Sequence, residues 1–136
     1  DHRDLHSFPT RRSSDLMVEE NEIQQIRDAI ANSPFVNDYE FVQSSPWYYE
    51  LLPKNASKGE GLMHLADLMN VDRSNTIGIG DNENDLALVK MANIGVAVSN
   101  AVDEVKEVAD FITVDNNSSA VAAVIYALYD GKIKFE

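Results

Sequence analysis

From residue 57 onward, apolar positions alternate between helical spacing and short continuous runs. Four segments have apolar residues three or four positions apart, which predicts helices. They are residues 57–69, 82–92, 101–109 and 119–129. Three short apolar runs lie between them and predict buried strands. These are residues 76–79, 95–98 and 111–113. Short apolar strands that alternate with helices are typical of a parallel sheet covered on both faces, so the pattern predicts an α/β fold.

Residues 17–54 follow a different pattern. Isoleucines recur at helical spacing among acids and glutamines, which predicts an amphipathic helix over residues 17–32. Two β-prone runs follow at residues 39–42 and 47–52, with a Ser-Ser-Pro turn between them. This part of the chain is therefore predicted to be a helix followed by a hairpin, which Pro53 ends.

Residues 1–16 have no helical or strand period, and their composition differs from the rest of the chain. They resemble the conceptual translation of a sequencing-library adapter, codon by codon. A segment of such origin is excluded from fold reasoning. We therefore expect residues 1–16 to be an artefact without a fold, and the natural sequence to be cut short where they join it.

Charge and composition narrow the classes of function. Eleven Lys and Arg against 23 Asp and Glu give a net charge of -12. Such a surface repels phosphate backbones and anionic lipid heads, which disfavours nucleic-acid and membrane partners. No apolar run reaches the roughly 20 residues that a membrane-spanning helix needs. The absence of cysteine excludes disulfides and a thiol nucleophile, and it is compatible with a cytoplasmic protein.

A run of polar residues follows the predicted strand at residues 76–79. Gly80 comes first and is followed by five polar residues, from Asp81 to Asp85. In open α/β sheets, ligands bind just past the carboxyl ends of the strands. Gly80 lets the backbone turn sharply, and the free N–H groups of the next helix point toward the same place.

Lys58 is predicted to lie at the same edge of the sheet. The helix over residues 57–69 is about 20 Å long. The strand at residues 76–79, with its lead-in, runs back over about 20 Å. Lys58 and Asp81 therefore finish close together. A cation beside carboxylates and amides can hold a divalent metal and a phosphate side by side, because carboxylates bind Mg²⁺ and lysine attracts phosphoryl oxygens.

Simpler interpretations need no ligand. Asp81 and Asp85 are also compatible with helix capping and dipole compensation, and Lys58 taken alone is typical of a solvated lysine. Five consecutive polar residues at the end of a strand favour a ligand site. A calcium loop does not fit, because Leu86 stands where glycine is needed and Ala92 where the bidentate glutamate is needed.

These residues resemble motifs of the haloacid dehalogenase (HAD) superfamily. Lys58-Gly59 and the run from Gly80 to Asp85 are similar to its third and fourth motifs. Residues 49–54 resemble the junction between cap and core in the Cof-type phosphatases, which include sugar phosphatases. The likeness covers residues 17–128, and it is specific because these motifs occur together.

The resemblance implies a Mg²⁺-dependent phosphatase that hydrolyses small phosphomonoesters, with sugar phosphates as the expected class, through an aspartyl-phosphate. By position, Asp81 is implied to be a Mg²⁺ ligand, Asn82 to add a contact to the metal site and Asn84 to contact the phosphate. Lys58 is implied to neutralise charge on the nucleophile and the phosphate. Asp85 is implied to orient Lys58 or a metal-bound water.

The resemblance also implies an incomplete protein. Residues 17–54 match the last part of an α/β cap, and residues 55–136 match the C-terminal half of a Rossmann-like core. The DxDGT motif that carries the nucleophile and the acid/base aspartate is absent, so we expect this chain to be inactive alone. Residues 116–121 replace the acidic-Gly step before the last helix, a change expected to shift the helix start and not the chemistry.

A small acidic cation-binding or regulatory domain without catalysis is the alternative hypothesis. Such a domain uses the Asp81 cluster for a cation alone. It predicts that cation binding does not depend on Lys58 and that phosphate has no role.

Overall fold

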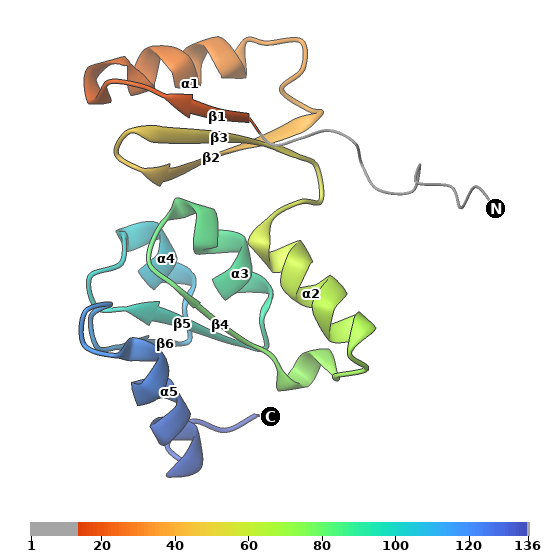
Figure 1. Ribbon diagram of the computed structural model, residues 1–136, viewed down its shortest axis with the longest axis vertical. Coiled ribbons are helices and arrows are strands. Elements are labelled where there is room, and N and C mark those ends of the chain that lie inside the picture. Colours follow the sequence, from red (N-terminus) through yellow and green to blue (C-terminus); the bar gives the residue numbers. More distant parts are fainter. Residues whose placement is uncertain (1–13, 136) are drawn as a thin grey trace, which may run out of the picture. The chain divides into compact units, whose positions relative to one another are not determined.

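The computed structural model describes residues 14–135, which form two compact units (Figure 1). The first unit ends at Ala56 and the second begins at Ser57. Each unit has its own three-stranded sheet. None of the helices in the described part of the chain has the length and apolar composition that a bilayer crossing requires.

The first unit is an antiparallel sheet with strand order β1-β3-β2, together with helix α1. Its elements are β1 (Ser14–Met17), η2 (Glu20–Glu22), α1 (Ile23–Ala31), β2 (Tyr39–Ser45) and β3 (Tyr48–Pro53). Tyr49 on β3 is 2% exposed. Arg27 of α1 lies over its ring, 5.1 Å from the ring centroid. The predicted helix and hairpin are both present.

Strand β1 corrects the expectation that residues 1–16 have no fold. Residues 14–16 lie in this strand together with Met17, which the apolar pattern assigns to a helix. Leu16 pairs with Tyr49, and Met17 pairs with Tyr48. Strand pairing uses backbone N–H and C=O groups, so a segment without an apolar period can still join a sheet edge. Residues 1–13 lie outside the described part of the chain.

The second unit contains the parallel sheet that the sequence predicts. Its elements are α2 (Lys58–Leu68), η3 (Arg73–Asn75), β4 (Ile77–Gly80), η4 (Glu83–Asp85), α3 (Leu86–Met91), β5 (Ile94–Val98), α4 (Asp103–Val108), β6 (Phe111–Thr113) and α5 (Ala120–Tyr129). The strands lie in the order β4-β5-β6 and all run parallel. Their carboxyl ends therefore meet at one edge, and the predicted α/β fold is confirmed.

Strand β5 forms the centre of the core, and all of its residues are buried. One apolar cluster joins it to α3, α4 and the first residue of α5, and a second joins it to the middle of α5. The buried members are Val89, Ala97, Val98, Ala101, Val105 and Ala120 in the first cluster, and Ile94, Val96, Val124 and Ile133 in the second. Figure 1 shows α3 and α4 on one side of the sheet and α5 on the other. Burial on both faces explains why β5 is a continuous apolar run in the sequence.

The last helix begins after a residue in the left-handed conformation. Ser119 has φ 57° and ψ 47°, and a Cβ makes this conformation costly by about 1–2 kcal/mol. Glycine adopts it readily. Replacing Ser119 with Gly is therefore expected to raise the free energy of unfolding by about 1 kcal/mol, measured by urea denaturation. Ala123→Gly, in the middle of the same helix, is the control and should lower it by about 1 kcal/mol. A Ser119→Gly chain no more stable than the wild type would contradict the prediction.

Candidate functional site

The candidate site is built on the loop after β4. The side-chain oxygen of Asn82 accepts a hydrogen bond from the Glu83 N–H, with 2.9 Å between Oδ1 and N. The Asp85 N–H donates to the Asn82 carbonyl oxygen, also at 2.9 Å. These bonds accompany the 3₁₀ turn η4, which precedes α3. The single helix predicted for this segment is therefore divided into two elements.

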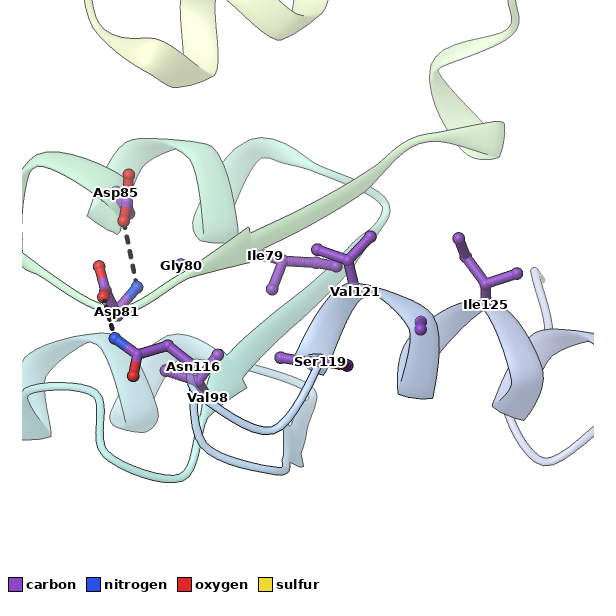
Figure 2. A pocket seen from close by; sticks show the side chains of 11 residues that line it. Ile79, Gly80, Asp81, Asp85, Val98, Asn116, Ser119, Val121 and Ile125 are labelled. Carbon is purple, nitrogen blue, oxygen red and sulfur yellow. Dashed lines mark hydrogen bonds between the residues drawn. The ribbon is translucent and has the colours of Figure 1, made fainter.

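Lys58 lies beside this loop, as the lengths of the helix and the strand predict. Its Nζ is 2.5 Å from Oδ1 of Asp85. The other oxygen, Oδ2, accepts a hydrogen bond from the Asp81 N–H at 3.1 Å (Figure 2). The Asp85 side chain is 11% exposed and the Lys58 side chain is 51% exposed. Asp85 therefore connects the lysine to the end of β4, while the lysine remains accessible to a ligand.

Two glycines make this approach possible. A Cβ at Gly59 would collide with the backbone carbonyl oxygen of Ala87, so only glycine allows α2 to contact α3 closely enough to bring Lys58 to the loop. A Cβ at Gly80 would lie 2.5 Å from the Cβ of Asp85. The sequence suggests that Gly80 serves a sharp turn, but its φ is not positive. The physical reason for this glycine is the close approach of Asp85.

The Asp81 carboxylate contacts a residue that follows a different strand. Asn116, beyond β6, donates a hydrogen bond from Nδ2 to Asp81 Oδ2 at 3.0 Å (Figure 2). The Asp81 carbonyl oxygen accepts one from the Val102 N–H at 3.0 Å. The sequence predicts that residues 116–121 shift the start of α5, and the structure also places Asn116 of this segment against Asp81. The sequence did contain a signal for this contact, because polar residues follow all three parallel strands and therefore meet at one edge of the sheet.

The remaining predicted site residues, Asn82 and Asn84, lie on the same loop and are half-buried. Within the described residues, no three His, Cys, Asp or Glu side chains gather into a metal-binding group. Asp81 and Asn82 nevertheless offer the oxygen ligands that Mg²⁺ prefers. The residues present therefore fit such an ion as part of its ligand set.

A cavity of about 580 Å³ lies beside Asp81 in the second unit. Asp81, Asp85 and Asn116 line its polar end, and apolar residues of β4, β5 and α5 line the rest (Figure 2). Strand β4 has β5 on one side and no partner on the other among the described strands. Asp81 and Asp85 thus lie at one end of a largely apolar cavity. The cavity is next to β4, which is an edge strand among the described strands.

The model of the haloacid dehalogenase-like hydrolases matches residues 5–125. The chain belongs to this family. The matched range begins inside residues 1–16 and includes Lys58, the loop after β4 and Asn116.

The relatives of this HAD family member are longer than the chain. It is 39% identical over 112 residues to a "putative phosphatase" of Streptococcus pyogenes serotype M6, covering 81% of this chain and 41% of that protein. It is 37% identical over 83 residues to the 5-amino-6-(5-phospho-D-ribitylamino)uracil phosphatase YwtE of Bacillus subtilis, covering 61% of this chain and 29% of that protein.

A solved structure is also similar to this chain and longer than it. The crystal structure of SMU.1108c from Streptococcus mutans matches with a TM-score of 0.78 and 29% identity, covering 87% of this chain and 44% of that one. The HAD chain therefore spans less than half the length of each of these proteins. The resemblance to the Cof-type phosphatases is confirmed by the family match and by the relatives.

Proposed function

We propose that the chain is the C-terminal half of a Mg²⁺-dependent Cof-type phosphatase. Residues 17–54 are the last part of its cap, and residues 55–136 are the second half of its core. The whole protein hydrolyses small phosphomonoesters, with sugar phosphates as the substrate class. Family membership supports the reaction type. The name of the Bacillus subtilis relative, which specifies a phosphorylated ribityl chain, supports the substrate class.

The observation that carries this proposal is the network of Lys58, Asp85 and Asp81. A phosphoryl group carries negative charge, which a positioned ammonium group stabilises. Asp85 binds the Lys58 ammonium through one oxygen and the Asp81 N–H through the other. The spacing between the lysine and the end of β4 is therefore fixed before any ligand binds. Preorganisation of this kind is what makes charge stabilisation effective in an active site.

Each side chain has a distinct role in the proposal. Asp81 and Asn82 hold Mg²⁺, and Asn84 contacts the phosphate. When bound, the ion supplies positive charge to the phosphoryl oxygens. Lys58 neutralises charge on the phosphate, and Asp85 positions Lys58. This chain thus supplies binding and charge neutralisation, while the attacking aspartate of the family belongs to a motif that this sequence lacks.

Titration calorimetry with Mg²⁺ and inorganic phosphate tests the proposal. Phosphate is expected to bind only when Mg²⁺ is present. Lys58→Ala is expected to weaken phosphate binding at least about tenfold, because a hydrogen bond to a charged group contributes about 1.5–3 kcal/mol, and to leave Mg²⁺ binding in place. Lys90→Ala is the control, since this exposed lysine lies on α3. If Mg²⁺ binds, but phosphate does not bind or binds equally well to Lys58→Ala, the proposal is contradicted. That result would support the acidic cation-binding domain.

A further inference from the structure

Two asparagines outside the predicted site residues form a hydrogen-bond network that ends on the Asp81 carboxylate. Asn116 donates from Nδ2 to Asp81 Oδ2 at 3.0 Å. Asn100 donates from Nδ2 to Asn116 Oδ1 at 3.1 Å, and its own Oδ1 accepts from the Asn116 N–H at 3.0 Å. Asn100 follows β5 and Asn116 follows β6. Hydrogen bonds therefore connect the carboxyl ends of all three parallel strands.

The chemistry of these groups allows one orientation of both amides. A carboxylate oxygen accepts hydrogen bonds, so the nitrogen of the Asn116 amide faces Asp81. Its oxygen then faces the NH₂ group of Asn100. A backbone N–H only donates, so the Asn100 oxygen faces the Asn116 backbone. Rotating the Asn116 amide by half a turn would break both of its side-chain hydrogen bonds.

We propose that Asn116 is a positioning residue that fixes the rotamer of the Asp81 side chain, with Asn100 as its anchor. This inference rests on the proposed function of Asp81 as a metal ligand. The Asp81 backbone is already held, by Asp85 at its N–H and by Val102 at its carbonyl oxygen. Rotation of the carboxylate is the freedom that remains, and the hydrogen bond from Asn116 restricts it.

An amide suits this role better than a charged donor. Lysine or arginine at residue 116 would neutralise the carboxylate and compete with a bound cation. The neutral Asn116 amide holds one oxygen and leaves the negative charge available. Partners that orient a metal-binding side chain affect metal affinity even though they do not touch the ion.

The rotamer of Asp81 can be measured without any metal. Three-bond NMR couplings to Asp81 Cγ in the labelled 136-residue chain report its rotamer populations. One dominant rotamer is expected in the wild type, and averaged couplings are expected in Asn116→Ala. Asn100→Ala keeps the bond from Asn116 to Asp81 but removes its anchor, so partial averaging is expected. One dominant Asp81 rotamer in Asn116→Ala would overturn the inference.

Asn117→Ala is the matched control. Asn117 is the neighbouring exposed asparagine, and its backbone N–H bonds to Asp115. Alanine retains that N–H, so the couplings of Asp81 should equal those of the wild type. The thermal midpoint of Asn116→Ala should also remain at the wild-type value, because Asn116 is exposed. Positioning is thereby distinguished from a general loss of structure.

Mg²⁺ titration of the same variants, followed by backbone amide shifts, tests the consequence for binding. Asn116→Ala is expected to bind Mg²⁺ about tenfold more weakly than the wild type, whereas Asn117→Ala binds equally well. Asp81→Asn should lose the response. Wild-type affinity in Asn116→Ala would overturn the inference about metal binding. A wild type without a response, or an Asp81→Asn variant that keeps it, would instead overturn the proposed function, and the couplings would still decide whether Asn116 positions Asp81.

Discussion

The 136-residue chain by itself is expected to release no inorganic phosphate from p-nitrophenyl phosphate in the presence of Mg²⁺. A covalent phosphoryl intermediate needs an attacking side chain, and the DxDGT motif that supplies it in the family does not occur in the sequence. The two aspartates of the site already hold other groups. Asp85 binds Lys58 and the Asp81 N–H, and Asp81 binds Asn116. Under the proposed function, binding and charge neutralisation therefore remain, and the covalent step is expected to be missing.

The matched positive control is a chimera. It joins the part of the Streptococcus pyogenes relative that precedes the matched region to residues 17–136 of this chain. Phosphate release is expected to return in the chimera. Lys58→Ala should then lower kcat by about 100-fold, as loss of one positioned electrostatic group does in other active sites, whereas Lys90→Ala should leave it unchanged. If the chain alone releases phosphate and Lys58→Ala abolishes that release, the prediction of inactivity is contradicted. A folded chimera without turnover would contradict the proposed function.

Gly59→Ala is expected to lower the free energy of unfolding of the second unit by about 3 kcal/mol, the upper range for overpacking a core. The added Cβ would collide with the Ala87 carbonyl oxygen and would meet the Met91 Sδ at 2.7 Å. A backbone carbonyl cannot move aside as a flexible side chain can. Helices α2 and α3 must therefore separate, which also draws Lys58 away from Asp85.

Gly61→Ala provides the control within the same helix. A Cβ at Gly61 has no atom within 4 Å, so this substitution should raise the free energy of unfolding by about 1 kcal/mol through helix propensity alone. Urea denaturation followed by far-UV circular dichroism measures both variants. Equal stability of Gly59→Ala and Gly61→Ala would show that the close contact between α2 and α3 is unimportant.

Much of the second unit could be predicted from local sequence pattern. The apolar run of β5 predicts a strand buried on both faces, and the spacing within α2 predicts a helix with Ser57 at its start. Ser57 does cap α2, because its Oγ accepts a hydrogen bond from the Glu60 N–H at 3.3 Å. Helix and strand lengths then place Lys58 at the carboxyl end of β4. Its ion pair with Asp85 agrees with that prediction.

Other features depend on contacts between segments far apart in the chain. Residues 14–17 have no apolar pattern that indicates a strand. They form β1 because their backbone pairs with that of β3. The 3₁₀ turn η4, by contrast, is a local feature that replaces the start of a predicted helix because Asn82 caps it.

The sequence by itself determined the order of the main helices and strands of the second unit, its parallel sheet and the edge at which Lys58 and Asp81 meet. These properties follow from local periodicity and from the fixed rise per residue of helices and strands. Only the tertiary structure decided that Asn116 holds the Asp81 carboxylate and that Gly80 is needed for the close approach of Asp85. Both depend on how atoms pack once the chain has folded, and residues 81 and 116 are separated by 35 positions that no local pattern spans.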